Sequence, residues 1–240
     1  MEWEMRCRRG PILPAGEFTR RAAWGPQIHQ GPWGANYSVP DFSPEYLPDE
    51  AFALYPHYGV NRMMIYGDLL CYACSKALPE LDSPDYERNI AMLGDAARRA
   101  ARYGIRFCYL PIGPKLRPDH PVFLAHPGAR GAGVFTRDRK AVLHFLCSSS
   151  PETLAFYRET FSNLYRAVPQ MGETVLITYS ESFYHCRMWE HKMPTPCPVC
   201  ATRQAERVLS GLVGSVRRGV EESGSDAQVA MWIYSWRARK

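Results

Sequence analysis

Two periods of apolar residues alternate along this chain. Helical spacing, as in Leu154, Tyr157 and Phe161, predicts amphipathic helices, and short continuous apolar runs that end in polar residues predict buried strands. Strands that alternate with helices are joined by right-handed crossovers, so we expect a parallel sheet. The expected strands are residues 21–24, 60–66, 105–110, 141–146, 175–179 and 228–234, and the expected helices are residues 48–58, 83–103, 150–168 and 203–222.

The number of strands bears on how complete this sheet is. The pattern gives about six strands in 240 residues, whereas a complete eight-stranded barrel usually needs about 250 residues. We therefore expect an α/β fold of the (β/α)8 TIM-barrel type that is incomplete in this chain and cut short at its C-terminus. Residues 1–19 are expected to be an irregular N-terminal lead-in, and residues 20–240 a partial TIM-barrel domain. An open sheet closed by oligomerisation is the alternative.

Charge and hydropathy narrow the class of protein. The net charge of +5 is mild, and short basic groups such as Arg98-Arg99 with Arg102 are expected to lie on solvated helix faces. The chain has no nucleic-acid motif and no glycine-rich nucleotide loop, so we expect no nucleic-acid partner. No apolar run approaches the roughly 20 residues of a membrane helix, and the N-terminus lacks the apolar region of a signal peptide. We expect no membrane partner and a cytoplasmic location, unless the start of the gene is missing.

A carboxylate follows the apolar run at residues 174–179. In parallel barrels the carboxyl ends of the strands carry the chemistry, and Glu181 stands at that end of this predicted strand. Glycoside cleavage needs a carboxylic acid to protonate the leaving oxygen, and shielding by neighbouring aromatic rings would raise the pKa of such an acid. We predict that Glu181 is a general acid. A strand-end glutamate that pairs with an arginine or caps a helix is the alternative.

The cysteine spacing predicts a metal site. Eight cysteines in 240 residues are too few for a disulfide scaffold. Zinc binds four ligands in a tetrahedron, and a CxxC pair supplies two of them. A structural zinc that staples the loop after the acid strand is therefore expected on His185, Cys186, Cys197 and Cys200, or on the three cysteines with a water. Reduced free thiols and a redox-active CxxC pair are the alternatives, and no other cofactor is required. A rival metal set joins both CxxC pairs of the chain: Cys71, Cys74, Cys197 and Cys200.

Several short segments occur in the order of one enzyme family. They are Arg21-Ala22, Asn61 to Asp68, Tyr103-Gly104-Ile105, Ala125-His126-Pro127, Leu146 to Thr153 and Leu176 to Glu181. In this order the chain resembles the catalytic TIM barrel of glycoside hydrolase family 20, the β-N-acetylhexosaminidases. It resembles uncharacterised bacterial barrel proteins related to that family more closely. The resemblance implies a saccharide substrate, Glu181 as the acid, and Arg21 as a ligand for sugar hydroxyls.

Two departures limit what this resemblance implies. The family has an aspartate before the acid that orients the acetamido group of the substrate, and Ser180 stands in its place. The acidic motif of the family's third strand is replaced by Tyr109-Leu-Pro-Ile-Gly-Pro-Lys115. Catalysis through the acetamido group is therefore not expected. Asp68 is a candidate for the second carboxylate or for a ligand of a sugar hydroxyl, with an ordinary capping aspartate as its alternative.

Aromatic side chains near the predicted strand ends suit a saccharide cleft, because a sugar ring stacks its C–H face on an aromatic plane. About half of them are expected to be core residues instead. The leading hypothesis is a glycoside hydrolase that acts on a saccharide. The alternatives are a non-catalytic carbohydrate-binding or structural barrel, and a zinc-stapled barrel with different chemistry. The sequence does not specify the sugar, the linkage or the oligomeric state. The candidate aromatic contacts are Tyr109, Tyr179, Trp232 and Trp236.

Overall fold

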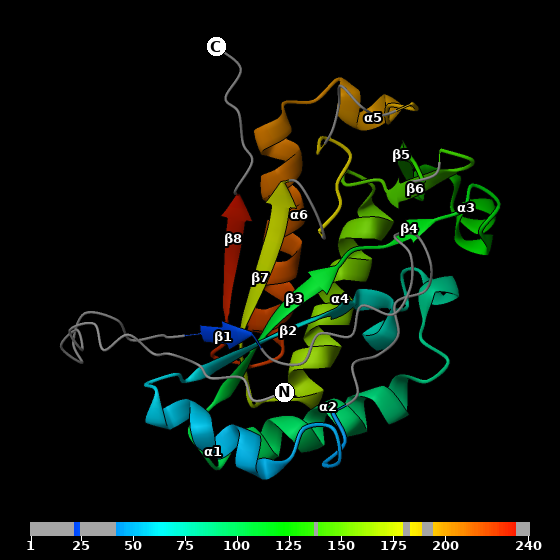
Figure 1. Ribbon diagram of the computed structural model, residues 1–240. Helices are drawn as coiled ribbons and strands as arrows, with labels where there is room; N and C mark the ends of the chain where they lie inside the picture. The colour runs from blue at the N-terminus through cyan, green and yellow to red at the C-terminus, as the bar shows by residue number, and fades with distance from the viewer. Residues whose placement is uncertain (1–21, 25–41, 137–138, 180–182, 189–193, 234–240) are drawn as a thin grey trace.

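A five-stranded parallel sheet forms the centre of the protein (Figure 1). The computed structural model describes residues 22–24, 42–136, 139–179, 183–188 and 194–233. The strands lie in the order β1-β2-β3-β7-β8, which is also their order along the chain. This is the order of successive strands in a β/α barrel, and the described residues form an open sheet with β1 and β8 at its edges. The strands are β1 (Ala22–Trp24), β2 (Arg62–Asp68), β3 (Arg106–Ile112), β7 (Met171–Tyr179) and β8 (Gln228–Ile233).

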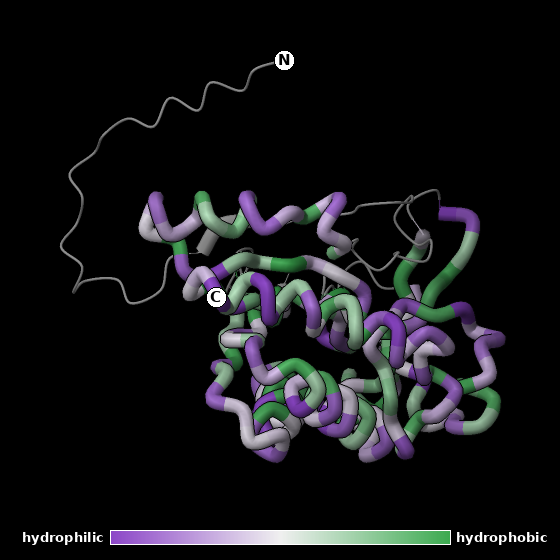
Figure 2. The backbone as a smooth tube through the Cα atoms, turned by 90° about the horizontal axis from the view of Figure 1, so that it is seen from below, coloured by the Kyte–Doolittle hydropathy of each residue, from purple (hydrophilic) through white to green (hydrophobic). Residues whose placement is uncertain are grey.

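Four helices connect these strands and pack against one face of the sheet. They are α1 (Asp49–His57), α2 (Tyr86–Ala101), α4 (Pro151–Ala167) and α6 (Ala205–Glu222). One continuous core lies between the helices and the sheet, and it includes Phe52 of α1, Leu93 of α2, Phe161 of α4 and Leu212 of α6. Hydrophilic and hydrophobic residues alternate around these helices, as the colours of Figure 2 show. The amphipathic spacing read from the sequence therefore identifies the buried faces correctly.

Local signals in the sequence set the ends of the helices. Ser150 caps α4, because its hydroxyl accepts the N–H of Thr153 and Pro151 occupies the first turn. Gly104 follows α2 with a φ of +71°, a conformation that favours glycine. The helix expected from residue 83 begins three residues later, at Tyr86, after a turn through residues 83–85, so the prediction of its first residue is wrong.

The part of the chain between β3 and α4 contains a second sheet. The strand expected at residues 141–146 forms, but it belongs to this antiparallel sheet, with strand order β4-β6-β5, and not to the parallel one. The pairing is mostly between neighbours in sequence, as in a hairpin, so no helical crossover is needed. This small sheet lies beyond the carboxyl end of β3 (Figure 1). Its strands are β4 (Lys115–Leu116), β5 (Arg130–Phe135) and β6 (Val142–Leu146), accompanied by α3 (Pro121–Ala125), η3 (Pro127–Ala129) and, after β7, α5 (Pro198–Ala201).

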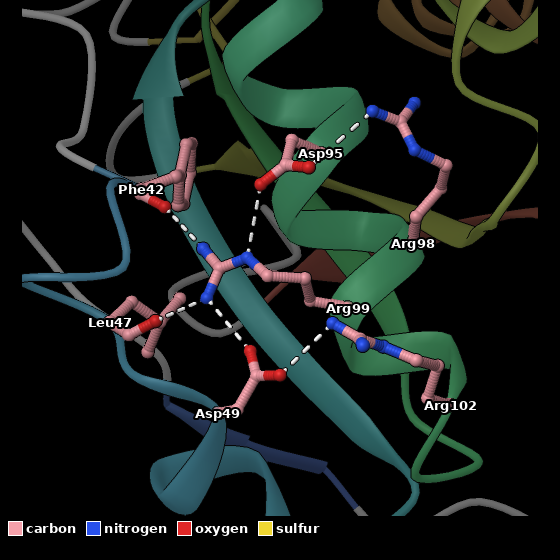
Figure 3. Close-up of polar contacts among 7 residues, drawn as sticks. All are labelled: Phe42, Leu47, Asp49, Asp95, Arg98, Arg99 and Arg102. Carbon is pink, nitrogen blue, oxygen red and sulfur yellow. Dashed lines mark hydrogen bonds and ion pairs between the residues drawn. The ribbon is translucent and has the colours of Figure 1, made fainter.

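The segment before α1 is anchored by Arg99 of α2 (Figure 3). This guanidinium donates to the carbonyl oxygens of Leu47 and Phe42, both at 2.6 Å, and it pairs with Asp49 at 3.1 Å and Asp95 at 3.0 Å. Arg99 is only 7% exposed, so the prediction of a solvated arginine is wrong at this position. A planar fork of five donors can satisfy two carbonyls and two carboxylates at once, which explains why an arginine is buried here.

Candidate functional site

The two faces of the parallel sheet differ in what covers them. Side chains alternate between the faces along a strand, and in-register neighbours share a face. The face opposite the helices carries a small apolar cluster built on Cys108, Leu110 and Ile177, with Met64 and Tyr66 packed against it. In a complete barrel this face would line the interior, and its carboxyl end is where catalytic groups are found.

Asp68 is the last residue of β2 and lies at that carboxyl end. Its carboxylate accepts the N–H of Leu70 at 2.9 Å and so caps the short 3-10 helix η1 (Leu69–Tyr72). Burial raises the pKa of Asp68 to about 6, while the Leu70 hydrogen bond and the positive charge of Lys115 oppose the rise. Asp68 is therefore a capping aspartate and also a group that titrates near neutral pH.

Lys115 is the charged neighbour of Asp68. Burial lowers the pKa of Lys115 to about 8, and the charge of Asp68 counteracts this effect. The ammonium group also lies over the ring of Tyr184, 4.4 Å from its centroid. The same ring stacks on that of Phe145 of β6, with the two centroids 5.1 Å apart. The small sheet and the segment after β7 thus position a cation beside the carboxylate at the end of β2.

Of the four predicted aromatic sugar contacts, three lie in strands that the structure describes. Tyr109 is 1% exposed and packs in the helix-side core, where its hydroxyl donates to the carbonyl of Gly67 at 3.2 Å. Trp232 of β8 pairs in register with Ile177, so it lies on the face opposite the helices, and it is 40% exposed. Tyr179 ends β7. Trp236 lies outside the described residues, as do Arg21, Ser180, Glu181 and the N-terminal residues 1–19.

Four cysteines converge beside this site. Cys147 follows β6, and Cys186 lies after β7. Cys197 is the N-cap of α5, and Cys200 lies within that helix. All four are buried, and their sulfur atoms lie within 4.8 Å of one another. The Sγ of Cys147 is 3.6 Å from that of Cys197 and 3.8 Å from that of Cys200. These distances exclude disulfide bonds, which need about 2.05 Å, and they suit a soft metal ion.

The expected histidine ligand does not join this cluster. The Nε2–H of His185 donates to the carbonyl of Thr178 at 2.5 Å, and its Nδ1 accepts the N–H of Arg187 at 3.3 Å. Both ring nitrogens are therefore used by the backbone, and burial lowers the pKa of His185 to about 4. Cys147 takes the fourth position instead. No motif in the sequence points to Cys147 as a ligand. It approaches Cys186 only because β6, the strand before it, pairs within the small sheet.

The rival metal set is not assembled either. Cys71 belongs to η1 and Cys74 follows it, both at the end of β2 and neither in the sulfur cluster. Burial raises the pKa of both thiols, that of Cys71 to about 12, with further contributions from nearby carboxylates. These two cysteines therefore stay protonated near neutral pH.

Similar folds occur among solved glycoside hydrolases. An α-N-acetylgalactosaminidase from Bifidobacterium bifidum, in complex with Gal-NHAc-DNJ, matches with a TM-score of 0.50 and 12% identity over 88% of this chain and 34% of that one. A GH138 enzyme targeting pectin rhamnogalacturonan II matches with a TM-score of 0.48 and 13% identity over 86% and 22%. A β-N-acetylhexosaminidase matches with a TM-score of 0.46 and 15% identity over 78% and 43%.

The first of these matches bears on the fold. The chain shares a parallel β/α architecture with that α-N-acetylgalactosaminidase. It spans less than half of the length of each structure named above. At such low identity the likeness concerns the fold alone, so membership of family 20 stays a prediction. No protein-family model matches the sequence, and no curated protein matches it. Among the described helices, none is long and apolar enough to cross a membrane.

Proposed function

We propose that the protein is a glycoside hydrolase that acts on a saccharide, with Glu181 as the general acid. The observation that carries the proposal is Asp68, a half-buried carboxylate with a pKa of about 6 at the carboxyl end of β2. Glu181 follows Tyr179, the last residue of β7, by two positions in the sequence, and β7 runs parallel to the strands beside β2. Glycoside cleavage requires two carboxyl groups, and Glu181 is the proposed partner of Asp68.

The two carboxyl groups have different roles in this proposal. Asp68 is mainly ionised at pH 7, because its pKa is about 6, and Lys115 beside it favours the ionised form. It therefore serves as the second carboxylate or as a ligand for a sugar hydroxyl. Glu181 donates the proton to the leaving oxygen. Arg21, Tyr179 and Trp236 are proposed contacts of the sugar.

Trp232 is the aromatic contact with the best structural support. It lies on the sheet face opposite the helices, level with Ile177, and 40% of it is exposed. An exposed indole on this face suits stacking against a sugar ring. Tyr109 takes no part in the proposal, because its ring is buried on the helix side of the sheet.

The replacement Glu181→Gln tests the general acid. We expect kcat/KM for a natural glycoside to fall by roughly 10²- to 10⁴-fold, the usual contribution of a positioned proton donor. Dinitrophenyl glycosides should lose much less, because their leaving group departs without protonation. The assay compares both substrate types across a panel of sugars. Glu206→Gln, at an exposed position in the first turn of α6, is the matched control and should retain activity. Equal losses on both substrate types, or no loss on either, would contradict the role of Glu181.

A carbohydrate-binding protein without catalysis is the second candidate. Ser180 and the segment from Tyr109 to Lys115 replace acidic positions of the related family, and this observation favours it. This candidate predicts saccharide binding that survives Glu181→Gln, with no turnover in the unmodified protein. Calorimetric titration of the same sugar panel distinguishes the two functions, and a protein that neither binds nor cleaves any of the sugars would exclude both.

A further inference from the structure

We propose that Cys147, Cys186, Cys197 and Cys200 bind one zinc ion through four thiolates, and that this ion is structural. A tetrahedral zinc with Zn–S bonds of about 2.3 Å separates its sulfur ligands by about 3.8 Å. The sulfur of Cys147 lies 3.6 and 3.8 Å from those of Cys197 and Cys200, and all four sulfurs lie within 4.8 Å of one another. The spacing of the cluster is thus that of an all-thiolate site.

Donors around the sulfurs favour the thiolate form. The N–H of Cys200 points to the sulfur of Cys197 at 3.4 Å, and the N–H of Ala132 points to the sulfur of Cys186 at 3.4 Å. The hydroxyl of Ser149 lies 3.2 Å from the sulfur of Cys200 and can donate to it once the thiol has lost its proton. Such contacts orient the ligands of a metal and tune their basicity. Binding of zinc releases the four thiol protons to solvent.

A glycine leaves room for the cluster. A Cβ on Gly131 of β5 would lie 2.7 Å from the sulfur of Cys186 and 2.8 Å from the carbonyl oxygen of Phe145. Such contacts are too short for any residue larger than glycine without movement of the backbone. The backbone of β5 at Gly131 therefore packs directly against the sulfur of Cys186. Such close packing suits a site that joins separate segments of the chain.

The site joins three segments of the chain. Cys147 directly follows β6, Cys186 lies in the segment after β7, and the CxxC pair lies at the start of α5, with Cys197 as its N-cap. All four positions of the tetrahedron are filled by protein, so no position is open for a substrate and the role is structural. Two residues before Cys186, Tyr184 contacts Lys115, the cation beside Asp68. Zinc thus holds the ring that positions this lysine.

Elemental analysis and X-ray absorption test the proposal without any activity assay. Protein purified without added metal should contain about one zinc per chain, and absorption spectroscopy should show four sulfur neighbours at about 2.3 Å. Less than about 0.2 zinc per chain, iron in place of zinc, or a mass that shows two disulfides would overturn the proposal. A nitrogen neighbour at about 2.0 Å would overturn Cys147 as the fourth ligand and favour His185.

Single cysteine variants provide the matched controls. Cys147→Ser should lose zinc or bind it more weakly by at least tenfold, whereas Cys74→Ser should retain one zinc per chain, because Cys74 lies outside the cluster. If Cys147→Ser does not fold, a competition titration of the unmodified protein with a chromophoric chelator measures the affinity instead. Zinc loss in Cys74→Ser together with retention in Cys147→Ser would overturn the assignment.

Discussion

At the scale of single residues, burial and a neighbouring cation determine how Asp68 ionises. Burial raises its pKa to about 6, and Lys115 limits the rise. Between about pH 4 and pH 6 the folded protein therefore holds a proton that the unfolded chain has released. In that window each rise in pH lowers the free energy of unfolding, and above pH 6 the destabilisation is complete.

Asp68→Asn should remove this pH dependence. The free energy of unfolding of the variant, minus that of the unmodified protein, should increase from pH 4 to pH 6.5 by at most about 3 kcal/mol, the equivalent of about two pKa units. Asparagine retains the cap on Leu70, so the local fold should persist. Urea unfolding at several pH values measures the difference. Asp119→Asn is the control. Its difference in the free energy of unfolding should not change with pH over this range, because Arg117 lowers the pKa of this exposed carboxyl. If the free-energy difference for Asp68→Asn did not change with pH, the raised pKa of Asp68 would be contradicted.

At the scale of secondary-structure elements, helices α4 and α6 meet at a glycine. A Cβ on Gly219 would lie 2.2 Å from the carbonyl oxygen of Arg158 and 3.0 Å from its carbonyl carbon. The helices run side by side behind the sheet in Figure 1. Gly211, on the same helix, has no atom within 4 Å of the corresponding position. The periodicity of the sequence predicts α6 but does not distinguish these two glycines.

Alanine at the two glycines should have opposite effects. Gly219→Ala should lower the free energy of unfolding by about 1–3 kcal/mol or more, because backbone atoms must move apart. Gly211→Ala should raise it by about 0.5–1 kcal/mol, because alanine favours the helix. Denaturant unfolding of both variants measures the pair. Equal effects at the two positions would contradict the packing of α4 on α6.

At the scale of the whole molecule, two of the described clusters of buried residues stabilise different parts. The large core lies between the sheet and the helices, and a smaller cluster contains the four converging cysteines, Phe145 and Tyr184. A small cluster with buried thiols depends on its metal more than a continuous apolar core does. If the cluster binds zinc as proposed, loss of the ion should therefore open the small sheet before the parallel sheet.

Hydrogen exchange before and after zinc removal tests this order. We expect exchange to accelerate by about tenfold or more in β5 and in residues 183–188, the segments that the cluster joins. Protection of β3 and α4 should change little, because both contribute to the large core. Mass spectrometry of peptic peptides measures both regions in one experiment. Uniform acceleration across all of them would contradict two separable cores.

The sequence by itself determined the order of the five strands of the parallel sheet and of the four helices between them, because side-chain periodicity depends only on local geometry. It also determined that a carboxylate follows the buried strand β7 and that Asp68 ends β2. Only the tertiary structure decided that Cys147 and not His185 completes the sulfur cluster, that Arg99 is buried, and that Lys115 neighbours Asp68. These pairs join positions that are distant in sequence, and pairing between strands and packing of helices bring them together. A local pattern carries no information about such contacts.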